Sequence, residues 1–306
     1  MSAALGQLST RARVFLAIAL WLFITIVVGV VLPAGARNDT FKPQNEFKLD
    51  SWISIKVGGI DLSLNKAVLY IFIACALTAF TMIWIARRMQ ERPNRVQTAV
   101  EAIYGLMRDN ITRDNLDSKM AAKWFPFIGS LFLFIWFSNL IGYLPLPTNT
   151  SEKVNIFGFH IPAFSLYAAT ANLSVPLVLA LVVWLSYNSE GLRTKGLRGY
   201  LKALIPDGVP GPLRPFIFVL ECFSQFMRLV SLSVRLFANI LAGHLIILFM
   251  SGALAVILGI AAVGIVTLPL GIAIYIFEIG LVATLQAFIF ATLTAIYLGE
   301  AAAAHH

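Results

Sequence analysis

Long apolar runs alternate with shorter polar segments along most of the chain. A helix needs about 20 mostly apolar residues to cross the hydrocarbon core of a membrane. Uncharged runs of roughly that length predict crossings at residues 14–32, 67–86, 124–151 and 164–189, and within the long segment after Pro215. A tight external turn at Pro145–Pro147 is predicted to end the third crossing. That last segment predicts two long helices, about 216–249 and 265–298, because residues 245–277 contain no ionisable side chain except Tyr275.

Composition agrees with this pattern. The chain has 306 residues, of which 59% are hydrophobic, and its mean hydropathy is +0.83. Soluble domains are only about half apolar. We therefore expect an all-α membrane protein with five core transmembrane helices and one extra helix near the N-terminus.

The net charge of +8 is compatible with binding to nucleic acid, but its distribution favours a membrane topology. The connections between predicted crossings fall into two sets, one on each side of the membrane. One set holds fifteen basic residues: eight in 87–123, five in 189–214 and two before the first apolar run. The opposite loops, 33–66 and 145–163, hold six. Because basic residues favour the cytoplasmic side, we expect both termini inside and no nucleic-acid partner.

The N-terminal region has two interpretations. The first apolar run follows Arg11 and Arg13 and precedes an A-x-A site at Ala34 and Ala36, which is typical of a cleaved signal, but the run is also long enough to remain as an anchor. The predicted domains are a signal or anchor (1–36), an external loop (37–66), a membrane domain (67–299) and a C-terminal tail (300–306). Within the membrane domain, helical spacing of apolar residues after Pro93 predicts an amphipathic helix along the inner face.

Polar residues recur at steps of three or four along the otherwise apolar helix 216–249. By the helical period all of them lie within about a quarter of its circumference: Glu221, Ser224, Gln225, Arg228, Ser231, Arg235 and Asn239. An arginine at the membrane centre costs about 2.5–3.5 kcal/mol on insertion scales, so a functional role is expected for Arg235. Arg228 has a structural alternative, in which it pairs with Glu221 or extends its charge to the membrane surface.

Two further ionisable residues lie on the last two helices. His244 is about 140° round the helix from the polar stripe, and Glu278 is a lone carboxyl in the final helix. A histidine beside a buried carboxyl would make a proton relay. The alternative for Glu278 is a neutral, locally hydrogen-bonded carboxyl.

Motifs of soluble enzyme chemistry are absent from the sequence. There is no nucleotide-binding loop, zinc motif or nucleophile elbow, so we expect no catalytic residue, no metal and no cofactor. Cys75 and Cys222 occupy apolar helix patterns without CxxC spacing and are expected to be packing residues.

Four segments of the chain resemble one membrane-protein family. The segment SLSVRLFANILAGHL (231–245), with FPFIGSLFLFIWFSNLIGYLP (125–145), TANLSVPL (170–177) and LQAFIFATLTAIYL (285–298), is similar to the a subunit of bacterial F-type ATP synthase. The resemblance covers about residues 50–299. It implies a non-catalytic membrane subunit whose last two helices are long and tilted against the rotating c-ring.

The resemblance also implies roles for particular residues. Arg235 matches the arginine that faces the ion-binding carboxylate of a c subunit, and Glu221 matches an acidic position near the inner half-channel. The expected proton-translocating set is Arg235, Asn239, Gly243, His244, Glu278, Gln286 and Glu221. Further channel-lining candidates are Asn139, Asn172, Ser174, Ser231 and Arg228.

One spacing departs from the family pattern. The family usually places the acidic residue seven positions before the glutamine of LQAF, but Glu278 precedes Gln286 by eight. In an α-helix one residue rotates a side chain by about 100°, so the sequence leaves open whether Glu278 pairs with His244.

The implied function is the movement of ions, protons in the first place, through two half-channels that end at the c-ring. The implied partners are c subunits, b subunits, the rest of the ATP synthase and membrane lipid, in the bacterial inner membrane. Three other classes of membrane protein fit the sequence less well. A secondary transporter would show two related halves, a membrane enzyme would need a nucleophile or metal cluster, and an isolated cation channel would be obstructed by Arg235.

Overall fold

The described part of the chain falls into two compact units. The computed structural model describes residues 19–21, 23, 25–27, 49, 51–54, 56–57, 60–61, 63–88, 94–156, 159–205, 208–250, 258 and 260–303. Unit 1 comprises residues 1–48 and 243–278, and unit 2 comprises residues 49–242 and 279–306.

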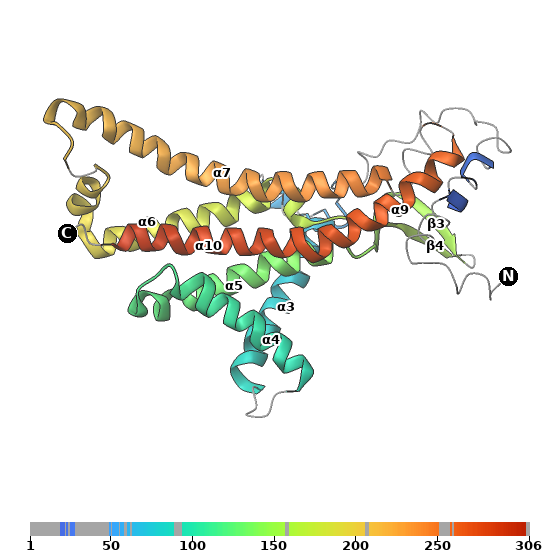
Figure 1. Ribbon diagram of the computed structural model, residues 1–306, viewed down its shortest axis with the longest axis horizontal. Helices are drawn as coiled ribbons and strands as arrows, with labels where there is room; N and C mark the ends of the chain where they lie inside the picture. The colour runs from blue at the N-terminus through green and yellow to red at the C-terminus, as the bar shows by residue number, and fades with distance from the viewer. Residues whose placement is uncertain are drawn as a thin grey trace. The chain divides into compact units, whose positions relative to one another are not determined.

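Helices make up almost all of the membrane region (Figure 1). The long ones are α3 (Lys66–Arg88), α5 (Ser118–Gly142), α6 (Ser174–Ala203), α7 (Arg214–Leu248), α9 (Ala261–Phe277) and α10 (Ala283–Ala302). Among the described residues five helical segments are long and apolar enough to cross a membrane, and α9 and α10 together form one of them, Val263–Ala302. The prediction of an all-α membrane protein with five core crossings is confirmed.

Two helix ends differ from the predicted apolar runs. The third crossing begins earlier than its uncharged run, at Ser118, and ends at Gly142, just before the prolines that were predicted to end it. The run predicted at 164–189 becomes α-helical only at Ser174. The helical segment extends through charged sequence to Ala203, with a break at Gly196, whose φ of 70° is not helical. The apolar scan missed the start at Ser118 and the end at Ala203 because it counted charged helical turns as loops.

Short antiparallel strands occupy connections between helices. Strands β1 (Lys56–Val57) and β2 (Ile60–Asp61) pair within the predicted external loop. Strands β3 (Leu146–Ile156) and β4 (Phe159–Ser165) pair from Leu146 with Ser165 to Ile156 with Phe159. The second hairpin replaces a simple turn expected at residues 145–147 and brings the end of α5 back toward α6.

The predicted amphipathic helix is divided in two. It consists of α4 (Arg95–Gly105) and a π-helix, η2 (Leu106–Arg113). Asn94 caps its start by accepting a hydrogen bond from the Gln97 backbone N–H at 2.8 Å. Its two faces differ in burial, since Val96 is exposed whereas Gln97 and Met107 are buried.

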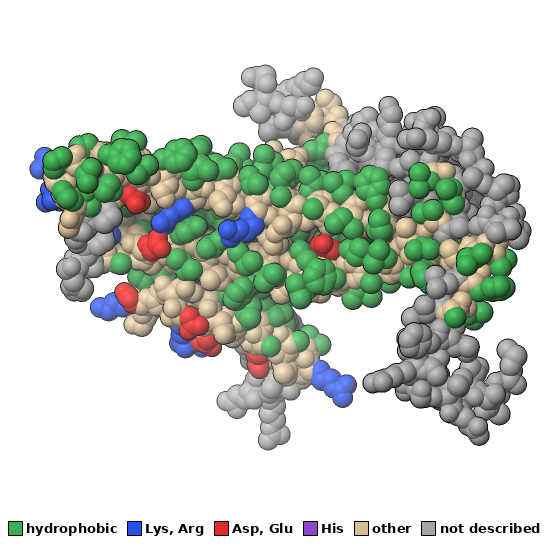
Figure 2. Space-filling view, turned by 45° about the horizontal axis from the view of Figure 1, so that its top comes forward, with side chains coloured by type: hydrophobic (Ala, Val, Ile, Leu, Met, Phe, Trp, Pro, Cys, Tyr) green, Lys and Arg blue, Asp and Glu red, His purple; other side chains and the backbone are tan. Residues whose placement is uncertain are grey.

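The hydrophobic core of unit 2 is built from α5, α6, α7 and α10. Its fully buried members include Ile128 of α5, Val183 of α6, Ile240 of α7 and Ala291 of α10. Elsewhere the surface of the long helices is mostly apolar, with charged side chains in isolated patches (Figure 2). Such a surface suits contact with lipid. Lipid tails are as apolar as these side chains, so no hydrophobic force drives the side chains to be buried in the protein.

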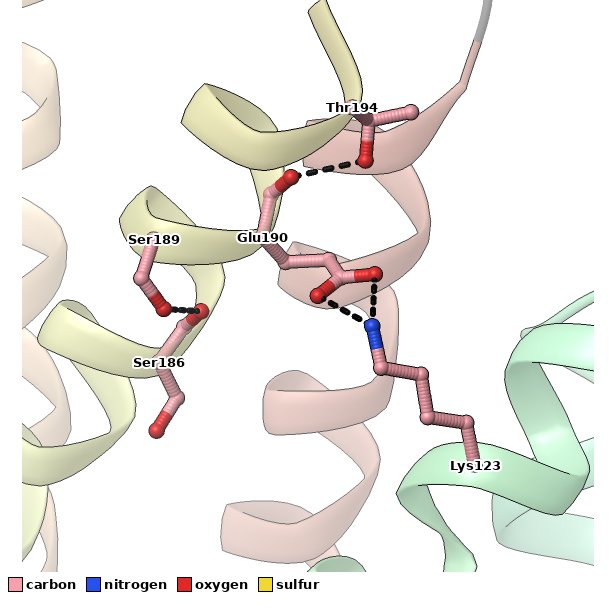
Figure 3. A network of polar contacts seen from close by, with 5 residues as sticks. All are labelled: Lys123, Ser186, Ser189, Glu190 and Thr194. Atoms are coloured by element: carbon pink, nitrogen blue, oxygen red, sulfur yellow. Dashed lines mark hydrogen bonds and ion pairs between the residues drawn. The ribbon is translucent and has the colours of Figure 1, made fainter.

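An ion pair joins α5 to α6 inside unit 2. The Lys123 Nζ lies 2.6 Å from Oε1 and 2.7 Å from Oε2 of Glu190, and the Glu190 side chain is only 5% exposed. The Lys123 side chain extends from α5 and the Glu190 side chain from α6, and the two charged groups meet between the helices (Figure 3). A buried carboxylate needs such a partner, so this pair fixes the charged end of α6.

The N-terminal segment is described only in short stretches. Residues 19–21 and 25–27 are helical, and the Trp21 indole donates a hydrogen bond of 3.2 Å to the Ile265 carbonyl of α9 within unit 1. Most of the predicted signal or anchor, 1–36, lies outside the described residues, so its removal or retention stays a prediction. At the other end, α10 continues to Ala302 and so extends into the predicted tail.

Candidate functional site

The polar stripe of α7 is present and changes from half-buried to exposed along the helix. Glu221, Gln225 and Arg228 are half-buried, whereas Arg235 and Asn239 are exposed. The other two members, Ser224 and Ser231, are half-buried and exposed respectively. The stripe predicted from helical spacing therefore opens onto the surface in the half of α7 that contains Arg235.

Arg235 lies deep within its helix. At about 1.5 Å per residue it is about 32 Å from the first residue of α7 and about 20 Å from the last. In the described part of the chain its guanidinium has neither a hydrogen bond nor an ion pair. Two of its exposed neighbours, Ala238 and Ala242, are small. A charge in this position needs a partner from outside the chain or access to water.

Gly243 and Glu278 lie against each other in unit 1. A Cβ added to Gly243 would be 2.5 Å from Oε2 of Glu278 and 2.8 Å from Oε1. The Glu278 residue is 8% exposed, and His244, which follows Gly243 in the chain, is 2% exposed. The absence of a side chain at Gly243 therefore makes the space that the carboxylate fills.

A π-helix begins at Glu278. The segment η6 (Glu278–Val282) lies between α9 and α10, and a π-turn accommodates one more residue than an α-turn. The rotation of about 100° expected from the eight-residue spacing assumed a continuous α-helix. That assumption is wrong, because the segment that begins at Glu278 is a π-helix.

Asn139 joins three elements of unit 2 within the membrane. It is fully buried on α5, accepts a hydrogen bond of 2.8 Å from the Thr170 hydroxyl and donates one of 3.4 Å to the Ala283 carbonyl. Gln286, 5% exposed, lies almost one turn beyond Ala283 on α10. The Asn139 side chain therefore contacts α10 less than one turn from Gln286.

Asn172 and Ser174 lie in the connection that leads into α6. The Asn172 Oδ1 accepts a hydrogen bond of 3.1 Å from the Ser174 backbone N–H. Burial raises the pKa of the neighbouring Tyr167 to about 12, and the nearby Tyr70 adds to the shift. The Lys66 ammonium lies 4.7 Å from the centre of the Tyr167 ring. The Asn172 side chain therefore helps to fix the backbone where α6 begins, and its predicted place in the channel lining stays a prediction.

Arg228 pairs with a residue that the sequence did not indicate. Its Nη1 lies 2.6 Å from Oε2 of Glu300, and its guanidinium carbon is 4.8 Å from the centre of the Tyr297 ring. The structural alternative in which Arg228 pairs with Glu221 is therefore wrong in its partner. Sequence spacing relates residues along one helix, whereas Glu300 belongs to α10, 72 positions away.

Residues 68–299 match the family described as ATP synthase A chain. This chain belongs to that family. Proteins named ATP synthase subunit a share 34% identity with it in Parvibaculum lavamentivorans, over 85% of this chain and 92% of the relative, and 34% in Rubrobacter xylanophilus, over 81% and 88%. A third, from Rhodopseudomonas palustris, is 32% identical over 86% of this chain and 99% of its own length.

Membership of the ATP synthase A chain family fixes the general function. The family is the proton-translocating membrane component of ATP synthase, and it is not the catalytic part. The chain is therefore a membrane subunit of the ATP synthase complex that takes part in ion transport and ATP synthesis. The resemblance and class inferred from the sequence are confirmed, while the roles of individual residues stay predictions.

Proposed function

We propose that protons pass along this chain in two half-channels, and that Arg235 separates them while facing carboxylates of the c-ring. The observation that carries the proposal is the exposed guanidinium on an apolar helix without a partner among the described residues. Its cost of about 2.5–3.5 kcal/mol is offset if an ionised carboxylate passes in front of it. The small Ala238 and Ala242 on the same face allow another helix to approach closely.

The outer half-channel would lead protons to that face. Its proposed groups are Asn172, Ser174, Asn139, His244, Glu278 and Gln286. The carboxylate of Glu278, seated against Gly243 next to His244, supports a relay in which the imidazole and the carboxyl exchange a proton. A proton delivered to a c carboxylate neutralises it, and the neutral group can then rotate into lipid.

On the ring's return, the positive charge of Arg235 favours the ionised form of the c carboxyl. The released proton would leave along the α7 stripe, past Asn239, Ser231 and Arg228, toward Glu221. The same charge repels a proton that would pass directly between the half-channels. The membrane potential supplies about 2.3 kcal/mol per charge per 100 mV.

The proposed location is the bacterial inner membrane, with the connections rich in basic residues on the cytoplasmic side. Proposed neighbours are c subunits at the exposed face of α7, b subunits, and lipid around the apolar helices. Whether the segment before residue 37 is removed does not alter this assignment.

The test is ATP-driven acidification of inverted vesicles that contain the complete ATP synthase. Arg235→Ala should abolish acidification while the complex still assembles. Arg214→Ala is the matched control, because Arg214 is an exposed arginine of the same helix at its membrane-surface end. If Arg235→Ala pumped at nearly the wild-type rate, the role assigned to Arg235 would be wrong.

A further inference from the structure

A proline interrupts the backbone hydrogen bonds of α9. Pro269 lies inside this helix and has no backbone N–H, so it cannot donate to the carbonyl four residues earlier, which belongs to Ile265. In the hydrocarbon region of a membrane no water replaces the missing donor, and an unsatisfied carbonyl there is costly. Helices that cross membranes tolerate proline where a neighbouring group supplies another donor.

The N-terminal segment supplies a donor to this carbonyl. The Trp21 indole N–H donates a hydrogen bond of 3.2 Å to the Ile265 carbonyl oxygen, across 244 positions of sequence. Both residues belong to unit 1, and the described part of the segment is drawn in dark blue in Figure 1. The tryptophan therefore contacts α9 at the carbonyl that Pro269 leaves without its usual donor.

The described residues around Trp21 have the two faces expected of a helix in lipid. Trp21 and Thr25, one turn apart, are half-buried, whereas Leu20 is 59% exposed and Phe23 and Ile26 are each 64% exposed. The Thr25 hydroxyl donates a hydrogen bond of 2.9 Å to the Trp21 carbonyl. The polar side-chain groups of this stretch are thus satisfied within the protein, and its exposed face is apolar, which suits lipid better than water.

We propose that the mature chain keeps its first apolar run, 14–32, as an additional membrane helix, and that Trp21 docks this helix on α9 at the Ile265 carbonyl. The run is long enough to cross hydrocarbon. Cleavage after Ala36, at the A-x-A site, would remove Trp21 and leave the Ile265 carbonyl without its indole donor. The partner of this surface of α9 is therefore a segment of the same chain. The inference goes beyond the proposed function, because it concerns no step of proton transfer.

The first test is the N-terminus of the chain in the purified, complete ATP synthase. Intact-mass measurement and peptide mapping by mass spectrometry show whether residues before Arg37 are present. We expect the peptide that contains Trp21 to be recovered from the assembled complex in the same amount as peptides of α10. A chain that begins at Arg37 would overturn the inference.

The second test is a double-mutant cycle between Trp21 and Pro269, measured as Tm of the intact chain in detergent. Trp21→Phe removes the indole N–H and keeps an aromatic ring. It should lower Tm by about 2–4 °C, the shift expected for one net hydrogen bond. In a Pro269→Ala background the alanine N–H can itself bond to the Ile265 carbonyl, so Trp21→Phe should lower Tm much less. The difference between the two backgrounds isolates the hydrogen bond from the packing of the ring.

Trp52→Phe is the matched control. Trp52 is 43% exposed, and its indole has no hydrogen bond among the described residues. This substitution should leave Tm unchanged in both backgrounds. Docking at the Ile265 carbonyl would be contradicted if Trp21→Phe lowered Tm equally with and without Pro269→Ala, or if it lowered Tm in neither background.

Discussion

The carboxylate of Glu278 occupies the space that a side chain on Gly243 would need. A Cβ there would lie 2.5 Å from Oε2, whereas ordinary van der Waals contact begins at 3.4 Å. Gly243→Ala must therefore displace Oε2 by about 0.9 Å, the difference between these two distances. Because the displaced atoms are at the end of a flexible side chain, we expect the helices to keep their positions.

A displacement of this size is large for proton transfer. Donor and acceptor atoms must approach to about 2.6–3.2 Å, and a misplacement of about 1 Å can slow a reaction about 10²-fold. We therefore predict that Gly243→Ala slows ATP-driven acidification of inverted vesicles by about 10²-fold, with wild-type amounts of assembled complex. Gly243→Val should be slower still.

Gly280 provides the matched control. It lies in the π-helix that begins at Glu278, and a Cβ added to it meets nothing within 4 Å. Gly280→Ala should pump at the wild-type rate. A second variant, Gly243→Ala with Glu278→Asp, shortens the acidic side chain by one carbon–carbon bond of about 1.5 Å and should recover part of the lost rate.

The reasoning would be refuted by equal, wild-type rates in Gly243→Ala and Gly280→Ala. It would also fail if Glu278→Asp made the Gly243→Ala defect worse, since relief of the steric conflict is the reason for expecting recovery.

Two further predictions concern stability. Lys123→Ala removes the charge-assisted hydrogen bonds to the buried Glu190. It should lower the free energy of unfolding by about 1.5–3 kcal/mol, measured as a lower Tm in detergent. Lys119→Ala, at an exposed position, should leave Tm unchanged, and equal effects of the two substitutions would contradict a stabilising role for the pair. Tyr167 should ionise near its pKa of about 12. The folded protein then holds more protons than the unfolded chain as pH rises from about 10 to about 12, so stability falls in that range. Tyr167→Phe should reduce this fall in chemical unfolding measured against pH, and an unchanged dependence would show that Tyr167 is not its source.

Helical periodicity was enough to predict the α7 stripe, because positions along one helix determine which side chains share a face. It could not predict the Arg228–Glu300 pair, which depends on how α10 packs. The π-helix at Glu278 was also missed. Apolar residues have the same pattern in both helix types over so short a stretch, and only the backbone hydrogen bonds distinguish them.

Connections were harder to predict than crossings. The hairpin of β3 and β4 lies where a single tight turn was predicted, because prolines indicate where a helix stops but not how the chain continues beyond it. Asn139 was found from the family resemblance. Its buried bonds to Thr170 and Ala283 come from two other elements and leave no periodic signal.

The central claim is that the exposed face of α7 with Arg235 meets the c-ring. Disulfide cross-linking tests it most directly, in the complete ATP synthase with Cys75 and Cys222 replaced by serine. Ala238→Cys on the exposed face should cross-link to a cysteine beside the c carboxylate and stop pumping until reductant is added, whereas Leu236→Cys, at a position that is 1% exposed, should not. Cross-linking from Leu236→Cys but not from Ala238→Cys would contradict the account.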